Sequence, residues 1–547
     1  MIKFDKKYLK QDTFLVISIF VYLLFILGWY YKLPWLIDHT VYLHIARALN
    51  VEDLNWWNAY KPLLPEGHHN ERWALLSLII IFDKMFFFLN PGSASQILLV
   101  SIHIGILVLI YKILNYYNNK VTANIFLIFW LFSSHHTKNR ATEFLAEPFA
   151  IFFICLAIFS FILLKKNKNH FFLFLASFSL ISVAFTKIHL SIMSLLIVII
   201  YFEIIKKNII KFVLYGFFTI IFYNLVLLFN YGLDLYIILI KNSLMVYKAY
   251  IGGGLAVGKG PTDGGWLMVW FERIMGPRTL MPIFFLSVLF IFSKKDNNNY
   301  IFSWLFIIFL ITIFALSAFS NFPANYGYAY PLYFFAIPCL AIFTEEFFDY
   351  KKNHYFQYIG IIFSSIVPLI VIYFIGKYIN NNFFNSFYVL TIILTLIFVT
   401  YFYLKKSFIS FYVLLFFLSI NTFWNNWDNL RIHYSWKNSY DKYYIFLRGA
   451  AKLIDNFDNE NIAVHFSTWP INKNRKNRDK YVIEPGIRSL IRNDIEITGF
   501  VGDEEVGSVK KFKYLVHDKF LENLKLKDKL KLNNIPKLYL YELINEN

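Results

Sequence analysis

Apolar runs about as long as a bilayer requires recur along this chain of 547 residues, separated by short polar segments. A transmembrane helix needs roughly 20 mainly apolar residues to cross a hydrocarbon core of about 30 Å. The pattern therefore predicts an all-α polytopic membrane protein with about thirteen spans. The predicted spans lie near residues 13–31, 73–89, 94–114, 143–164, 170–185, 189–205, 211–230, 279–293, 300–319, 328–343, 356–376, 387–404 and 407–423.

One further apolar stretch, Val121–Ser134, is too short for this pattern. As a helix its 14 residues would cover about 21 Å, which is less than the hydrocarbon core. We expect it to be re-entrant or to lie on the surface. The spans 170–185 and 189–205 are also short, and they meet at Thr186-Lys187-Ile188-His189 on the outer face.

Clusters of lysine set the predicted orientation. With thirteen crossings, every such cluster falls on the cytoplasmic side, as the positive-inside tendency requires. The excess of 53 Lys and Arg over 35 Asp and Glu therefore indicates topology rather than nucleic-acid binding. The clusters are Lys3-Lys6-Lys7-Lys10, Lys165-Lys166-Lys168, Lys206-Lys207-Lys211, Lys294-Lys295, Lys351-Lys352 and Lys405-Lys406.

The first span follows a basic start and has no small-residue cleavage site. We therefore expect a retained signal-anchor, a cytoplasmic N-terminus and a bacterial-type inner membrane location. Cys155 and Cys339 lie in separate apolar runs, which favours packing roles over a disulfide or a thiolate metal site.

This topology leaves three segments outside the cytoplasm: the loop 32–72, the loop 231–278, and everything after about residue 424. The loop 231–278 holds an amphipathic stretch, Leu233–Tyr250, followed by glycines between 252 and 265. No strand precedes these glycines and their spacing matches no phosphate-binding loop, so we expect a flexible loop over a site.

The composition becomes polar and charged from about Asn425. We expect residues 1–424 to form the transmembrane module and residues 425–547 a small extracytoplasmic α/β domain. Its predicted elements are a helix near 440–456 and strands at 462–466, 495–498, 513–516 and 537–541.

Four ionisable residues map to the outer face near membrane depth: Asp38, Glu143, Glu147 and Lys187. A charge at the bilayer centre costs roughly 2.5 to 3.5 kcal/mol, so charges that persist there usually face a cavity or a partner. Their convergence on one face predicts a site.

Asp38 has two interpretations. It is an interfacial acid paired with a nearby cation such as Arg47, Lys61 or Arg72, or it is a general base that takes a proton from an acceptor hydroxyl.

Glu143 and Glu147 are four residues apart and share one face at the start of a helix. Helix capping alone explains Glu143, because a carboxylate complements the positive end of the helix dipole. Glu147 lies one turn deeper, before an apolar run, and solvation explains it less easily. We therefore expect Glu147 to have a role in the site.

Lys187 either extends its ammonium group to the membrane interface or neutralises a lipid-linked phosphate. The cations Arg72, Lys61 and Arg140 are further candidates for binding that phosphate. The loop residues His68 and His69, with acidic neighbours, are also candidates for substrate contact. Paired histidines with flanking glutamates can ligate a divalent metal, but adjacent histidines do not readily share one ion and no helical i,i+4 spacing is present. A metal is therefore the minority interpretation, and we expect no cofactor.

Four local motifs resemble those of the GT-C superfamily of membrane glycosyltransferases, particularly the protein O-mannosyltransferases and the lipid A aminoarabinose transferase. Asp38 with Tyr42 and Ala46-Arg47 resembles the acid of the first loop, and Arg140 through Glu147-Pro148 resembles the second acidic motif. Ala184-Phe185-Thr186-Lys187 resembles the lysine after a short span, and Tyr330-Pro331 through Pro338 the aromatic later span. The likeness covers about 400 residues.

The resemblance implies a polyprenyl-phosphate-linked sugar donor, an inverting displacement without nucleotide, and a lipid, glycan or protein acceptor. It implies that Asp38 is the base, that Glu147 orients a substrate, and that Lys187 and Arg72 hold the phosphate. His39 stands where many members have a second acid, which favours a single base over a carboxylate pair. Ala329 stands where an Arg often precedes the Tyr, which leaves the phosphate partner open.

Two other functions remain open. A cell-surface polysaccharide polymerase or ligase also has many spans and large outer loops, although it is expected to depend on Arg-rich outer loops. A lipid-linked sugar flippase belongs to a different class, in which internal repeats and midplane charges are common, and the sequence shows neither.

Overall fold

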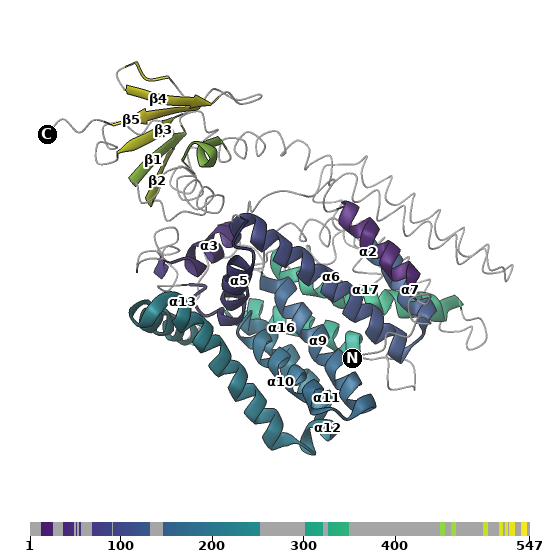
Figure 1. Cartoon of the computed structure of the whole chain (residues 1–547). Coiled ribbons are helices and arrows are strands. Elements are labelled where there is room, and N and C mark those ends of the chain that lie inside the picture. Colours follow the sequence, from purple (N-terminus) through teal and green to yellow (C-terminus); the bar gives the residue numbers. More distant parts are fainter. Residues whose placement is uncertain are drawn as a thin grey trace.

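The computed structural model describes residues 12–25, 37–48, 51, 54–55, 68–89, 91–131, 146–251, 301–320 and 326–348, and, in the C-terminal part, 449–454, 461–466, 496–501, 513–517, 520–522, 525–530 and 538–543. A bundle of helices and a small separate sheet make up these residues (Figure 1). The predicted spans 279–293, 356–376, 387–404 and 407–423 and the glycines of 252–265 lie outside them.

Three described helices contain a stretch long and apolar enough to cross a membrane: α6 (Pro91–Tyr117), α9 (Ala146–Asn167) and α13 (Ile209–Ile251). Shorter apolar helices accompany them: α2 (Thr13–Phe25), α7 (Lys120–Leu131), α10 (His170–Ala184), α11 (Ser191–Ile200) and α16 (Ile301–Ser320). The remaining helices are α3 (Ile37–Ala46), α5 (Trp73–Met85), η2 (Ile188–Leu190), α12 (Phe202–Lys206) and α17 (Tyr326–Phe348). The predicted helical, membrane-type fold is confirmed.

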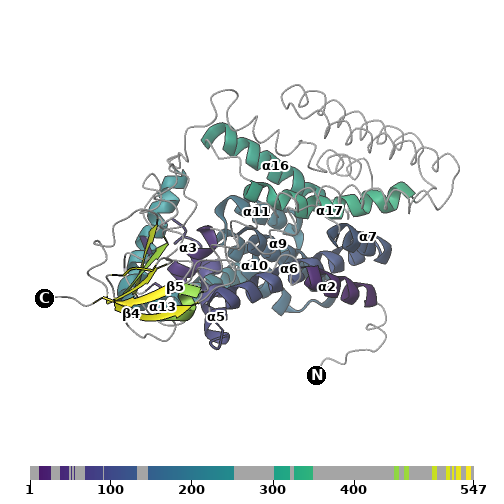
Figure 2. The same ribbon diagram turned by 90° about the horizontal axis from the view of Figure 1, so that it is seen from above.

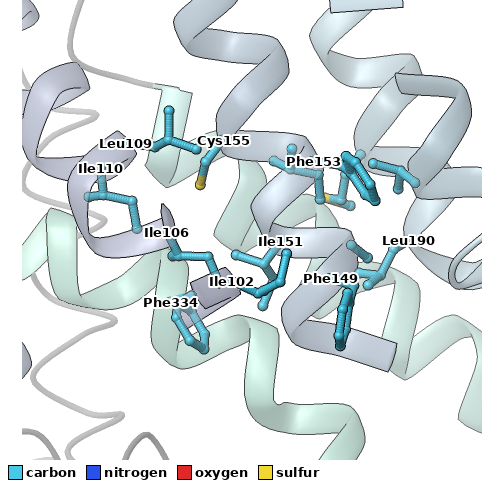
Figure 3. Packing of buried hydrophobic residues seen from close by; sticks show 14 of the residues in the cluster. Ile102, Ile106, Leu109, Ile110, Phe149, Ile151, Phe153, Cys155, Leu190 and Phe334 are labelled. Carbon is cyan, nitrogen blue, oxygen red and sulfur yellow. The ribbon is translucent and has the colours of Figure 1, made fainter. Parts of the chain in front are cut away.

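Helix α9 is the centre of the bundle, with α6, α10, α11 and α17 packed around it (Figure 2). On α6, Ile102, Ile106 and Ile110 recur every fourth residue and so form one face, which points toward Ile151 and Cys155 of α9 (Figure 3). The two helices approach closely at Gly105, where an added Cβ would lie 2.6 Å from the Phe152 ring.

Helix α13 consists of two sections that meet at Gly232, which has a φ of 72°. This left-handed conformation favours glycine, and it separates the predicted span 211–230 from the amphipathic stretch that begins at Leu233. Beside the kink, the Asn230 amide and the Tyr231 hydroxyl donate hydrogen bonds of 2.9 and 2.8 Å to the carbonyls of Ala46 and Ile45. The kink therefore holds the end of α3.

The bundle has two distinct ends. At one end, which we call the lysine end, the Tyr117 and Tyr201 hydroxyls lie 2.8 Å apart. The last turns of α9 and α12 carry Lys165 and Lys206. Lys112, near the end of α6, forms a 2.5 Å ion pair with Asp12, which precedes α2. The opposite end holds α3 and the Gly232 kink, and we call it the site end.

Helix α5 does not cross the bundle, so the predicted span 73–89 was wrong. At its start, the Ala74 amide donates to the carbonyl of Phe185, at the end of α10. Its last turns line a cavity of about 260 Å³ together with Asn230 and Pro91, which begins α6. Both ends of α5 therefore lie at the site end.

This correction reverses the direction of α6, which runs from the site end to the lysine end, and α7 then folds back against α6. Of the segment 121–134, which we expected not to cross, residues 121–131 belong to α7, and this helix packs against α2, α6 and α17. A hydropathy pattern shows how long an apolar run is, but it does not show whether the helix faces lipid or packs against other helices.

The C-terminal part contains a five-stranded sheet of order β2-β1-β3-β5-β4. Strands β2 (Glu496–Val501), β1 (Asn461–Phe466) and β3 (Tyr514–His517) are parallel, whereas β5 (Leu538–Glu542) and β4 (Lys525–Leu530) are antiparallel to their neighbours. Ala463, Leu515 and Tyr541 form its core. In both views the sheet lies nearer to α3 and α5 than to α7.

Four of these strands overlap predicted ones, and β4 was missed. Its sequence, Lys-Leu-Lys-Asp-Lys-Leu, carries four charges in six residues, which obscures a strand signal. At the edge of a sheet the same lysines discourage pairing with another chain.

The revised topology predicts a labelling pattern. We expect Lys84→Cys, at the end of α5, to react with a membrane-impermeant maleimide in intact cells, because the lysine clusters predict that the site end faces outward. Lys120→Cys, at the start of α7, should react only after permeabilisation. Both lysines are exposed, and the native cysteines are buried and provide an unreactive background. If Lys120→Cys reacts in intact cells and Lys84→Cys reacts only after permeabilisation, the segment 73–89 crosses the membrane after all.

Candidate functional site

Four charged side chains are buried together at the site end: Glu71, Arg72, Glu147 and Lys187. Their exposed fractions are 5%, 3%, 2% and 8%. Two positive and two negative groups withdrawn from water need close partners, because an unpaired buried charge is costly.

Glu147 and Lys187 form the central ion pair. The Lys187 Nζ lies 2.9 Å from Oε1 of Glu147. Glu147 occupies the first turn of α9, and Lys187 lies in the extended linker between α10 and η2. The sequence placed both residues on one face of the membrane, and the structure brings their side chains into contact.

Arg72 precedes the first residue of α5 and is held by Tyr42 and Glu71. One guanidinium N–H donates to the Tyr42 hydroxyl, and the guanidinium carbon lies 5.0 Å from the centroid of the Tyr42 ring. The Nε atom lies 3.5 Å from Oε1 of Glu71. The guanidinium therefore has a fixed position, as a binder of a planar anion requires.

Contacts of the next residue, Trp73, fix the start of α5 against the rest of the site. Its ring stacks on Phe185, with centroids 4.8 Å apart and planes 7° apart. Its Nε1 donates a 3.1 Å hydrogen bond to Oγ of Ser243, on the second section of α13. Because Phe185 lies two residues before Lys187, this stacking sets the position of Arg72 relative to Lys187.

Electrostatic interactions connect the pairs into one cluster. The charges of Lys187 and Arg72 act on the Glu147 carboxylate, and the charge of Lys187 also acts on Glu71. Burial raises the pKa of the Glu71 carboxyl from 4.5 to about 7, and a hydrogen bond from its own backbone amide and the positive charge of Lys187 oppose this rise.

Asp38 lies in the first turns of α3, one helical turn before Tyr42. The side chain of Asp38 lies outside the described residues. Because residues four apart share a helix face, the backbone places Asp38 on the face that presents Tyr42 to Arg72.

The other predicted residues have different outcomes. Lys61, Arg140 and Glu143 lie outside the described residues. His69 is buried and His68 is half-buried, and the His69 ring packs edge-on against Tyr42 with centroids 5.2 Å apart. Both histidines therefore lie beside the Arg72 cluster.

Sequence reasoning missed two features of the site. Glu71 was noted only as a neighbour of the histidines, although its position next to Arg72 was an available signal. Tyr247 donates a 3.2 Å hydrogen bond to the backbone carbonyl of Glu71, from the second section of α13. No pattern in the sequence links residues 176 positions apart.

Several solved structures are similar to this chain over most of its length. ArnT from Cupriavidus metallidurans bound to undecaprenyl phosphate is 10% identical with a TM-score of 0.53, over 97% of this chain and 98% of that one. The apo state of ArnT is 10% identical with a TM-score of 0.47, over 99% of each chain. The Archaeoglobus fulgidus oligosaccharyltransferase in the apo form is 11% identical with a TM-score of 0.42, over 92% of this chain and 69% of that one.

The first of these likenesses shows that the chain has a GT-C-type fold, as the sequence motifs predicted. No family model matches the sequence, and a search of curated proteins gives no match.

The central ion pair predicts a non-additive effect on stability. We expect Lys187→Met to lower the free energy of unfolding by about 3 kcal/mol or more, because it leaves Glu147 buried without its nearest cation. Glu147→Gln should be similarly destabilising. The double variant should regain most of this loss, since it leaves neither charge, and thermal unfolding in detergent measures all three. Additive losses would show that the two residues do not depend on each other.

Proposed function

We propose that this protein is an integral membrane glycosyltransferase that moves a sugar from a polyprenyl-phosphate-linked donor to a lipid, glycan or protein acceptor. The observation that carries the proposal is the buried Glu147–Lys187 pair beside Arg72, at the end of the bundle where α3 places Asp38. The fold supports it, because a chain of similar fold is solved with undecaprenyl phosphate bound.

In the proposed reaction an acceptor hydroxyl attacks the anomeric carbon of the donor sugar. The new bond from oxygen to carbon forms as the bond from carbon to the phosphate oxygen breaks, with inversion. The acceptor proton passes to Asp38, and polyprenyl phosphate leaves with the bonding electrons and one more negative charge. Asp38 acts as general base, which typically contributes about 10²- to 10⁴-fold to the rate.

Lys187 and Arg72 are placed to stabilise the charge that develops on the phosphate. Lys187 offers a point charge, and Arg72 offers parallel N–H donors that match two phosphate oxygens. Glu147 holds Lys187 in place through the 2.9 Å contact, and Tyr42 holds Arg72. Groups fixed before the reaction stabilise a transition state without the cost of reorganisation.

The wider architecture belongs to the same proposal. We place the site end on the extracytoplasmic side of a bacterial-type inner membrane, in a module of thirteen spans covering residues 1–424. The α/β domain 425–547 is placed on the same side, where it is available to bind the acceptor. The reaction as proposed uses no metal.

The role of Asp38 is tested by its amide variant. We expect Asp38→Asn to lower kcat for sugar transfer by roughly 10²- to 10⁴-fold and to leave the donor KM nearly unchanged, because only the base is lost. The assay uses purified protein in liposomes, a polyprenyl-phosphate sugar and candidate acceptors, and it measures released polyprenyl phosphate.

Asp83→Asn provides a matched control, since Asp83 lies in the last turn of α5. It should retain activity. Release of polyprenyl phosphate that survives Asp38→Asn would overturn the base assignment. Movement of the carrier across the membrane without sugar transfer would favour a flippase.

The role of Arg72 is tested by a substitution that keeps the charge. Arg72→Lys removes the planar fork that Tyr42 positions, so we expect the affinity for polyprenyl phosphate to fall by about tenfold, which corresponds to one lost charge-assisted hydrogen bond. Arg47→Lys, at the end of α3, should bind as the wild type does. If both variants change the affinity for polyprenyl phosphate equally, Arg72 does not contact the phosphate directly.

A further inference from the structure

We propose that His68, His69 and Glu71 form a binding site for one transition-metal ion of the zinc class, adjacent to Arg72. The three side chains each offer one donor atom, and these donor atoms lie within 4.8 Å of one another. Among the residues that the structure describes, no other group of three histidine, cysteine or acidic side chains brings its donor atoms this close together.

The spacing is close to that of a bound site. Donors that share a tetrahedral zinc ion at bond lengths of about 2.1 Å lie about 3.4 Å apart. Closing the cluster onto an ion therefore requires movements of little more than about 1 Å, which side-chain rotation supplies.

The backbone explains how adjacent histidines reach one ion, which the sequence pattern alone argued against. His69 has a φ of 84°, in the left-handed region that a non-glycine residue rarely adopts. This turn brings the two imidazole rings to the same side, with centroids 4.1 Å apart. The regular spacings that made a metal the minority interpretation do not apply to such a turn.

The Glu71 carboxylate provides an independent observation. Its Oε1 is 3.5 Å from Arg72, whereas its Oε2 is buried and has no hydrogen-bond partner among the residues that the structure describes. Buried carboxylate oxygens are normally satisfied, so this atom needs a cation or a donor. One donor atom of each histidine lies within 4.8 Å of a carboxylate oxygen of Glu71.

The donor set selects the kind of metal. Two imidazole nitrogens and one carboxylate oxygen suit zinc, cobalt or nickel, whereas magnesium and calcium prefer oxygen ligands alone. Three protein ligands also leave a position open for water or an anion. The half-buried His68 provides a side of the cluster that is accessible to an entering ion.

The site is coupled to Arg72 through two contacts. Glu71 is the neighbour of Arg72 in sequence, and the His69 ring packs against Tyr42, which accepts the hydrogen bond from Arg72. An ion at this place would fix the turn 68–72 and with it the position of the guanidinium.

The test measures metal binding and does not depend on any transferase activity. The full-length protein, purified in detergent with a tag free of histidine and treated with a chelator, is titrated with Co²⁺ and followed by visible absorption. We expect one Co²⁺ per chain, displaced by Zn²⁺ and not by Mg²⁺. Glu71→Gln, His68→Ala and His69→Gly should each weaken binding by at least roughly tenfold, as expected for loss of a ligand.

His69→Gly removes the ring and retains a residue that favours the left-handed turn, so it separates loss of a ligand from loss of the fold. His170→Ala is the matched control, since His170 is an exposed histidine at the start of α10. It should bind Co²⁺ as the wild type does, with the same elution volume in size-exclusion chromatography. Absence of stoichiometric binding, or binding that all three ligand variants retain, would overturn the proposal.

Discussion

The cost of burying charge is the constraint on which the site end depends. Glu71, Arg72, Glu147 and Lys187 are each at least nine-tenths withdrawn from solvent, and two of them are cations. Such groups persist only when each has an oppositely charged or hydrogen-bonding partner at close range. The start of α9, the linker after α10 and the turn before α5 must therefore meet at one place, although they are far apart in the sequence. The packing of Trp73 on Phe185 holds two of these three segments together.

The position of α5 follows from the same constraint. A helix that crossed the membrane at 73–89 would carry Asp83 and Lys84 to the lysine end, away from the cavity they line with Asn230 and Pro91. Lying at the site end, α5 keeps Arg72 next to Lys187 and also keeps its own charged last turn near the bundle surface.

The sequence was informative where composition alone decides the outcome. Long apolar runs predicted α6, α9 and α16, and the convergence of charged residues on one membrane face predicted that Glu147 and Lys187 belong together. Sequence patterns failed where packing decides. An apolar run does not reveal whether its helix faces lipid or protein, which is why the span at 73–89 was predicted wrongly. The contacts of Arg72 with Tyr42 and of Tyr247 with Glu71 join distant segments, and no local spacing indicates them.

The turn 68–72 combines features that are difficult to explain as packing alone. A histidine in a left-handed conformation and a buried carboxylate oxygen without a described hydrogen-bond partner are both unfavourable for folding. Unfavourable features of this kind persist when another interaction offsets them, and they concentrate at functional sites. A short turn that presents Arg72 to a lipid phosphate must be rigid, because a mobile guanidinium would lose affinity through the entropy of ordering it. Binding an ion at His68, His69 and Glu71 would satisfy the carboxylate oxygen and make the turn rigid at the same time, so one interaction accounts for both unfavourable features and for the fixed position of Arg72.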